Sequence, residues 1–77
     1  MDWGPRMTGW KIEYLPALSG SPVFSDEKAT LELAIDLSVD RGWERNVTRV
    51  IAVHGPDGRS ISGAELEALR AKARQQQ

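Results

Sequence analysis

The sequence contains no cysteine, which excludes two devices that commonly stabilise very short chains. Without thiols there is neither a disulfide nor a thiolate zinc site. A chain of 77 residues, 40% of them hydrophobic, is near the lower size limit of independently stable domains. The fold must therefore rely on one small packed core or on surface buried against a partner. This absence raises the expectation of self-association.

The chain also lacks a surplus of positive charge. Ten Lys and Arg residues stand against eleven Asp and Glu residues, and the formal net charge is -1. Nonspecific nucleic-acid binding depends on neutralising phosphates with cationic side chains. The overall charge therefore disfavours a nucleic-acid-binding function.

Long hydrophobic runs are missing as well. No apolar segment approaches the roughly 20 residues of a membrane-spanning helix. The segment MDWGPRMTGW also lacks the hydrophobic core of a signal peptide. We expect a cytoplasmic protein with no membrane partner.

The periodic part of the chain predicts a single domain over residues 10–74. Residues 1–9 carry Gly, Pro and Thr with little periodicity, which is typical of a flexible leader. Residues 75–77 are glutamines at the end of the chain, and they are predicted to form a disordered tail.

Alternation predicts the first strand. In WKIEYL, Trp10, Ile12 and Tyr14 alternate with charged residues, as expected for a strand with one buried face. The following PALSGSP has the Pro and Gly content of a turn. A short second strand is expected over residues 22–24.

The segment LELAIDLSVD fits both a strand and a helix, because its apolar residues alternate and also spread over a helical face. The ends favour the helix. Ser25 precedes two acids, as a helix cap does, and Arg41 and Gly42 resemble a helix end. The pattern predicts a helix over Asp26–Arg41, with Glu32, Asp36 and Asp40 on one solvated ridge.

The second half of the chain predicts a hairpin and a last helix. After a loop at WERN, the run VTRVIAVH is apolar on both faces, as a central strand is. In GPDG, Pro56 and Asp57 suit the corners of a type I turn and Gly58 the left-handed position, so RSI should form an edge strand.

The segment SGAE, Ser62 to Glu65, has the pattern of a capping box and predicts the start of a C-terminal helix. The apolar stripe of this helix is narrow, and it consists of Leu66, Leu69 and Ala73. Such a stripe predicts weak docking.

The quoted segments WKIEY, VFSDEKATLELAIDLSVDRG and VIAVHGPDGRSI resemble a group of short bacterial proteins of unknown function. That group is built as two strands, a helix and a third strand that closes in a V-x-H-G-x-D-G-x-I hairpin. The resemblance covers residues 10–61 and implies a fold but no activity. With the patterns above it predicts an α+β protein in ββαββα order, with one main helix on one face of a small antiparallel sheet and a short C-terminal helix.

The residues that carry chemistry do not assemble into a recognisable site. His54 is the only histidine, and its neighbour Asp57 is expected to help it hold the hairpin turn. Carboxylates one turn apart on a single helix cannot enclose a metal ion without ligands from elsewhere. The sequence predicts no catalytic residue, no metal site and no cofactor, and therefore a protein that is not an enzyme.

Four residues are candidates for an interaction surface: Trp43, Arg45, Arg49 and Arg59. Tryptophan and arginine are enriched among the residues that dominate binding energy. Trp43 has two interpretations, since it either anchors a partner or covers the core. Arg49 and Trp43 are expected to project from the uncovered face of the sheet.

The predicted function is a small non-enzymatic interaction module that self-associates or docks on a larger protein. Two surfaces suit this function, namely the uncovered sheet face and an edge strand with unpaired backbone groups. The alternative is a nucleic-acid-binding accessory protein, in which the arginines converge beside the sheet despite the neutral total charge.

Overall fold

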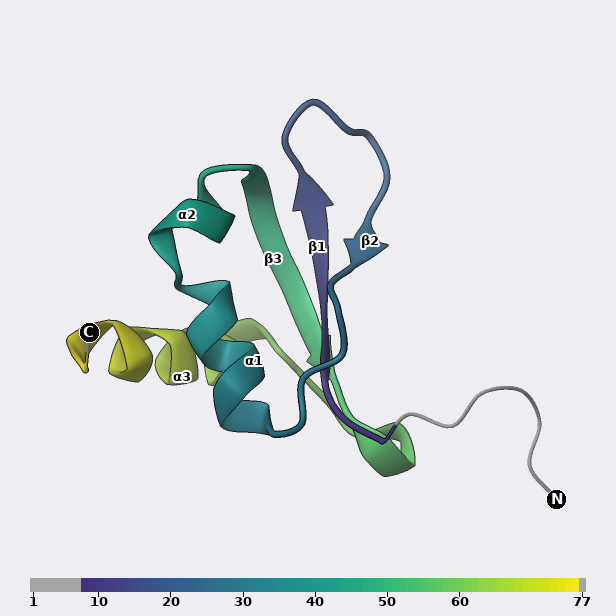
Figure 1. Cartoon of the computed structure of the whole chain (residues 1–77), viewed down its shortest axis with the longest axis vertical. Coiled ribbons are helices and arrows are strands. Elements are labelled where there is room, and N and C mark those ends of the chain that lie inside the picture. Colours follow the sequence, from purple (N-terminus) through teal and green to yellow (C-terminus); the bar gives the residue numbers. More distant parts are fainter. Residues whose placement is uncertain (1–7, 77) are drawn as a thin grey trace, which may run out of the picture.

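Four strands form one antiparallel sheet in the order β2-β1-β3-β4 (Figure 1). The structure is a computed structural model and describes residues 8–76. The strands are β1 (Lys11–Pro16), β2 (Val23–Phe24), β3 (Val47–His54) and β4 (Ser60–Ser62). The alternating segment β1 and the strongly apolar segment β3 occupy the centre, whereas the two shortest strands form the edges. The predicted α+β class with a small antiparallel sheet is confirmed.

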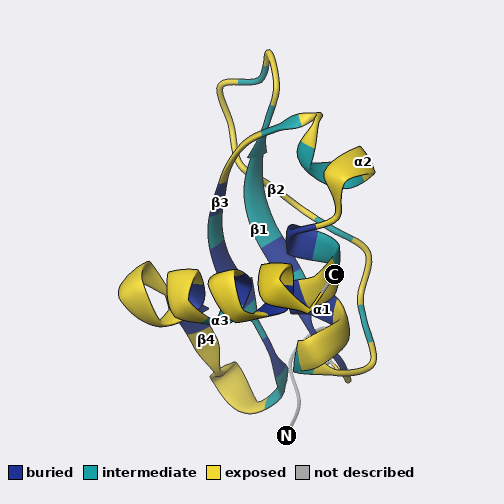
Figure 2. Cartoon of the chain, turned by 90° about the vertical axis from the view of Figure 1, so that its left-hand side faces the viewer, coloured by how far each residue is buried: buried dark blue, intermediate teal, exposed yellow. Residues whose placement is uncertain are grey.

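The helices lie on one side of this sheet, and Figure 2 shows α1 and α3 in front of it. They are α1 (Leu31–Ser38), α2 (Arg41–Glu44) and α3 (Gly63–Gln75), and a 3-10 turn, η1 (Pro56–Gly58), joins β3 to β4. The element order is thus the predicted ββαββα order with one additional short helix, α2.

The ends of the predicted domain are described in part. Residues 1–7 and 77 lie outside the described residues, and with them most of the predicted leader and the end of the predicted tail. Gly9, assigned to the leader, is buried, and a side chain there would overlap the backbone carbonyl of Lys28. At the other end, α3 includes Gln75, one residue beyond the predicted end of the domain.

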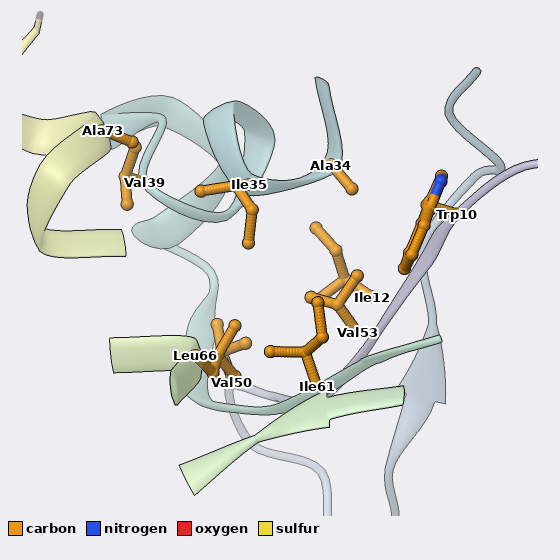
Figure 3. Close-up of a cluster of buried hydrophobic side chains, with 10 residues drawn as sticks. All are labelled: Trp10, Ile12, Ala34, Ile35, Val39, Val50, Val53, Ile61, Leu66 and Ala73. Atoms are coloured by element: carbon orange, nitrogen blue, oxygen red, sulfur yellow. The ribbon is translucent and has the colours of Figure 1, made fainter. Parts of the chain in front are cut away.

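A single apolar core fills the space between the sheet and the helices (Figure 3). In β3 the core residues are Val50 and Val53, three positions apart, because the register of β3 against β1 shifts between Glu13 and Tyr14. Partly buried hydrophobic residues pack around this core: Tyr14, Leu31, Leu37, Trp43, Val47 and Leu69. The buried members are Trp10, Ile12, Ala34, Ile35, Val39, Val50, Val53, Ile61, Leu66 and Ala73.

The main helix begins later than the sequence predicted. The backbone N–H of Ile12 donates to Ser25 Oγ (2.9 Å), and the N–H of Ser25 donates to the Ile12 carbonyl (2.8 Å). Ser25 therefore pairs with β1 and does not cap a helix. Thr30 is the cap, since its Oγ1 accepts from the N–H of Leu33 (3.1 Å). The predicted span Asp26–Arg41 was too long, but the choice of helix over strand was correct.

A second short helix replaces the predicted helix end and loop. The Oδ2 of Asp40 accepts a hydrogen bond from the N–H of Trp43 (2.9 Å), which satisfies a free donor of the first turn of α2. The prediction that the helix ends at Arg41 and Gly42 was wrong, and so was the predicted loop at Trp43 and Glu44, whereas Arg45 and Asn46 do form a turn. Asp40 is consequently a cap and not a member of the α1 ridge.

The β3–β4 turn is displaced by one residue from the predicted turn. Asp57 (φ 61°, ψ 28°) and Gly58 (φ 73°) both have positive φ, and the N–H of Arg59 donates to the Pro56 carbonyl (3.2 Å). These are features of a type I′ turn with Asp-Gly at its centre, the turn whose twist suits a hairpin. The predicted type I turn with Pro56 and Asp57 at its corners was wrong.

The start of α3 lacks the side-chain bond of a capping box. Ser62 occupies the N-cap position, but its side chain makes no capping hydrogen bond. Gly63 follows with φ 60°, a conformation that suits glycine. This residue turns the chain from β4 into α3.

The C-terminal helix docks firmly, contrary to the prediction from its narrow stripe. Leu66 and Ala73 are buried as expected, and Arg70 between them is buried too, with 7% of its surface exposed. Its Nη2 donates to the backbone carbonyl of Ser38 at the end of α1 (3.0 Å) and to Oε2 of Glu44 in α2 (2.7 Å). One guanidinium thus joins all three helices, and its charge suits the carbonyl end of α1.

We predict that Gly55→Ala destabilises the protein. A Cβ at Gly55 would overlap the Trp10 ring, 2.6 Å from Cη2, and overpacking of this kind costs about 1–3 kcal/mol. Gly20→Ala is the matched control, because nothing lies within 4 Å of a Cβ at Gly20. Urea denaturation should show a lower midpoint for Gly55→Ala alone, and equal midpoints for both variants would contradict the described packing.

We predict that Arg70→Met lowers the free energy of unfolding by about 1–3 kcal/mol, because the substitution removes buried charge-assisted hydrogen bonds to Ser38 and Glu44. Arg74→Met is the control. Arg74 also bonds Glu44 (2.6 Å), but its side chain is half exposed, and such pairs contribute less than about 1 kcal/mol. Denaturation curves of the two variants should separate. A loss from Arg74→Met as large as that from Arg70→Met would refute the assigned role of Arg70.

Candidate interaction surface

No helix within the described residues packs on one face of the sheet. Ile12, Val53 and Ile61 point into the core, so their strand neighbours point to the opposite face. The middle row of that face crosses all four strands in register, and it consists of Phe24, Glu13, Ala52 and Ser62. We call this surface the open face, and it comprises Lys11, Glu13, Leu15, Phe24, Arg49, Ala52, His54, Ser60 and Ser62.

Three side chains form the centre of the open face. Nε2 of His54 lies 2.8 Å from Oε1 of Glu13 on the neighbouring strand. The Phe24 ring meets the His54 ring edge to face, with centroids 5.7 Å apart and planes inclined at 62°. Such edge-to-face pairs stabilise by about 0.5–1.5 kcal/mol beyond the area they bury. The cluster is a defined patch of aromatic and charged groups on the sheet.

The expected role of His54 in the β3–β4 turn is not what the structure shows. His54 bonds Glu13 across the sheet, and no hydrogen bond within residues 8–76 joins it to Asp57. Ser60 is its cross-strand neighbour, but their side chains share no hydrogen bond.

Trp43 belongs to the helix-covered side. Its ring contacts Tyr14 edge to face, with centroids 4.9 Å apart, and it packs partly buried against the core. The expectation that Trp43 projects from the uncovered face was therefore wrong. Of its two interpretations, the structure supports the cover of the core.

The three candidate arginines do not form one patch. Arg49 lies on the open face opposite Leu15, and Arg45 follows α2 at the same end of the sheet. Arg59 lies at the other end, with its guanidinium carbon 5.2 Å from the centre of the Trp10 ring, a cation–π contact. Arg49 and His54 are five residues apart on β3, about 16 Å at 3.3 Å per residue.

Sequence reasoning missed three exposed apolar residues on the first hairpin. Phe24 and Val23 of β2 are 58% and 39% exposed, and Leu18 in the connecting loop is fully exposed. The order of strands at the sheet edge decides this exposure, and no pattern in PALSGSP indicates it. Leu33 on α1 is the other large exposed hydrophobic residue among those described.

Metal-binding clusters and membrane-spanning helices are both absent from residues 8–76. No group of three or more His, Asp or Glu residues there has the geometry to hold a metal ion. No described helix has both the length and the hydropathy needed to cross a membrane.

The chain matches no protein-family model, no curated protein and no solved structure. The open face and the exposed hairpin are therefore the observations on which a function can be argued.

Proposed function

We propose that this protein is a small non-enzymatic interaction module whose open face contacts a protein, either a second copy of the chain or a larger partner. The observation that carries this proposal is the exposed Phe24 on an uncovered sheet. The helices bury one face of the sheet, and Phe24 is 58% exposed on the other. Contact with a partner would remove this aromatic surface from water, and aromatic side chains are enriched in protein interfaces.

The make-up of the open face suits a protein contact. Binding energy concentrates on a few aromatic and arginine side chains at the centre of an interface, with a polar rim around them. Phe24 and His54 provide the aromatic centre. Lys11 lies directly opposite His54, and Arg49 lies opposite Leu15, beyond the row of Glu13 and Ala52. Ala52 at the middle of β3 is buried, with 6% of its surface exposed, so the contact area of the open face comes from the side chains around it.

The edges of the sheet suit strand addition less well. β2 and β4 have two and three residues, and short edge strands discourage pairing with another chain. Residues 47–51 of β3 have no partner in β4, but the register of β3 with β1 shifts twice. Such irregularities twist a strand and blunt its edge. We therefore favour the face over the edge, and we propose the cytoplasm as the location of the contact.

Nucleic-acid binding is the second candidate function, and one observation favours it. Exposed aromatic rings on an open sheet stack against unpaired bases in several RNA-binding domains, and Phe24 has this position with Lys11 and Arg49 nearby. The carboxylate of Glu13 lies in the same cluster and would repel phosphate. The separate position of Arg59 further reduces the local positive charge.

We predict that a photoreactive benzoylphenylalanine at position 24 crosslinks to one protein in cells that produce the chain. The same group at Leu33, which is 49% exposed on α1, is the control. A single adduct from position 24 and none from position 33 is the expected result, and its mass distinguishes a second copy from a larger partner. Equal labelling at both positions, or no adduct at position 24, would rule out the open face as the contact surface.

We predict no saturable binding of single-stranded RNA or DNA at low salt, measured by fluorescence anisotropy of a labelled oligonucleotide. A phosphate-driven complex would weaken steeply as salt is added. Salt-sensitive binding that is lost in both Phe24→Ala and Arg49→Ala would instead establish the nucleic-acid function. Arg74→Ala, on the helical side, is the control for unspecific charge effects.

A further inference from the structure

Leu18 combines two unfavourable properties. It is fully exposed to solvent, and its φ is 65°, in the left-handed region. The N–H of Ser19 donates to the Pro16 carbonyl (3.3 Å), so Leu18 is the third residue of a turn. Positive φ at this position is typical of a type II turn, which favours glycine there. A residue with a side chain that is both strained and exposed indicates a use for that side chain.

The loop holds Leu18 in a defined position. The N–H of Ala17 donates to the carbonyl of Asn46 (2.9 Å), which ties the loop to the segment before β3. The side chain of Ser19 bonds the backbone of Ser21, and Pro16 and Pro22 restrict the two ends. A loop ordered before binding loses little entropy when it docks. Residues 16–22 contain no charged side chain.

Two exposed arginines accompany Leu18 at this end of the molecule. Arg49 pairs with Leu15 at the end of β1, and Arg45 precedes Asn46, which bonds the loop. The nearby carboxylate of Glu44 is already engaged by Arg70 and Arg74. We call Leu18, Arg45 and Arg49 the hairpin knob. It presents an apolar tip with positive charge at its base.

A groove with the opposite character lies between α1 and α3. Its volume is about 260 Å³, and cavities of about 150 Å³ already admit benzene, so a leucine side chain fits. A second hollow continues it along α1 toward Asp40. Two carboxylates, Glu32 and Asp36, line the α1 side, against one cation, Lys72, on α3. The remaining lining residues are Leu31, Ile35, Leu69, Ala73 and Gln76.

We infer that the hairpin knob of one copy occupies the α1–α3 groove of a second copy. Leu18 would enter the apolar part of the groove, and Arg45 and Arg49 would face the carboxylates on α1. Charge complementarity argues for this occupant, since the apolar tip with a basic base meets an apolar groove with an acidic wall. This inference is independent of the proposed open face, which contains Arg49 but neither Leu18 nor the groove.

The two surfaces of one chain cannot meet each other. Figure 1 shows the β1–β2 loop at one end of the molecule, well away from α1 and α3. A knob and a groove at different places on the same chain produce a head-to-tail contact, which extends from copy to copy or closes into a ring. The assembly should therefore be a chain or a closed ring of two or more copies, and it should form as the protein concentration rises.

Two variants each remove one half of this contact. Leu18→Gly removes the apolar tip and suits the turn, so the protein should remain folded with equal or higher stability. Asp36→Arg reverses a charge on the groove and leaves the knob intact. We expect each change to weaken self-association about tenfold to a hundredfold. Leu33→Ala and Glu65→Arg are matched controls, since neither residue lies in the groove or the knob.

The decisive experiment mixes the two variants and measures mass by sedimentation equilibrium, after circular dichroism has confirmed that both are folded. Each variant alone should be monomeric at concentrations where the unmodified chain and the controls form oligomers. The equimolar mixture should form a 1:1 dimer and nothing larger, because one intact knob and one intact groove remain. Added salt should weaken this dimer.

Three results would overturn the inference. The unmodified chain could be monomeric at all concentrations, or Leu18→Gly could associate as strongly as the unmodified chain. In the third result, each variant alone is monomeric and the mixture is monomeric too, which shows that the two changes do not affect opposite halves of one contact. A crosslink at position 24 would survive any of these results, so the open-face proposal is tested separately.

Discussion

Burial of one face of the sheet is the constraint on which the rest of the structure depends. The chain is short, and its apolar side chains are sufficient for one layer between the sheet and its helices. Ile12, Val53 and Leu66 at the centre of that layer are almost completely buried. Within residues 8–76, no helix covers the opposite face of the sheet. A partner on that face would add a second packed layer.

The helical side depends on one polar residue as well as on the apolar layer. Arg70 is buried beneath α3 and satisfies a carbonyl of α1 and a carboxylate of α2. Its Nε has no hydrogen-bond partner among residues 8–76, so the network is only partly satisfied. Buried charges are tolerated when they are paired, and here the pairing fixes where α1 ends, where α2 lies and how α3 crosses both. The groove between α1 and α3 owes its shape to this arrangement.

The surfaces of the molecule point in different directions and differ in chemistry. The open face combines aromatic, acidic and basic groups, the first hairpin presents an apolar tip with arginines at its base, and the helical side carries an acidic groove. Strain in the backbone occurs at both hairpins, at Leu18 and at Asp57. Both turns require positive φ, but aspartate tolerates the left-handed conformation and is followed by glycine at Gly58, whereas Leu18 occupies a turn position that favours glycine. This contrast is the reason to connect Leu18 with a contact outside its own chain.

Elements whose signals are local could be predicted from the sequence. Alternation predicted β1, a strongly apolar run predicted β3, and the residue types at the segment ends favoured helix for α1. The SGAE pattern predicted the start of α3, and Pro-Gly content predicted both hairpin loops. The remaining features depend on contacts between distant segments. Ser25 has the chemistry of a helix cap, but in the fold its hydroxyl oxygen accepts a hydrogen bond from the backbone N–H of Ile12 in β1. Trp43 covers the core because α2 forms, and Arg70 is buried because two other helices supply oxygen atoms where α3 crosses them. Contacts between residues far apart in the chain decide such roles, and a pattern within one segment contains no record of them.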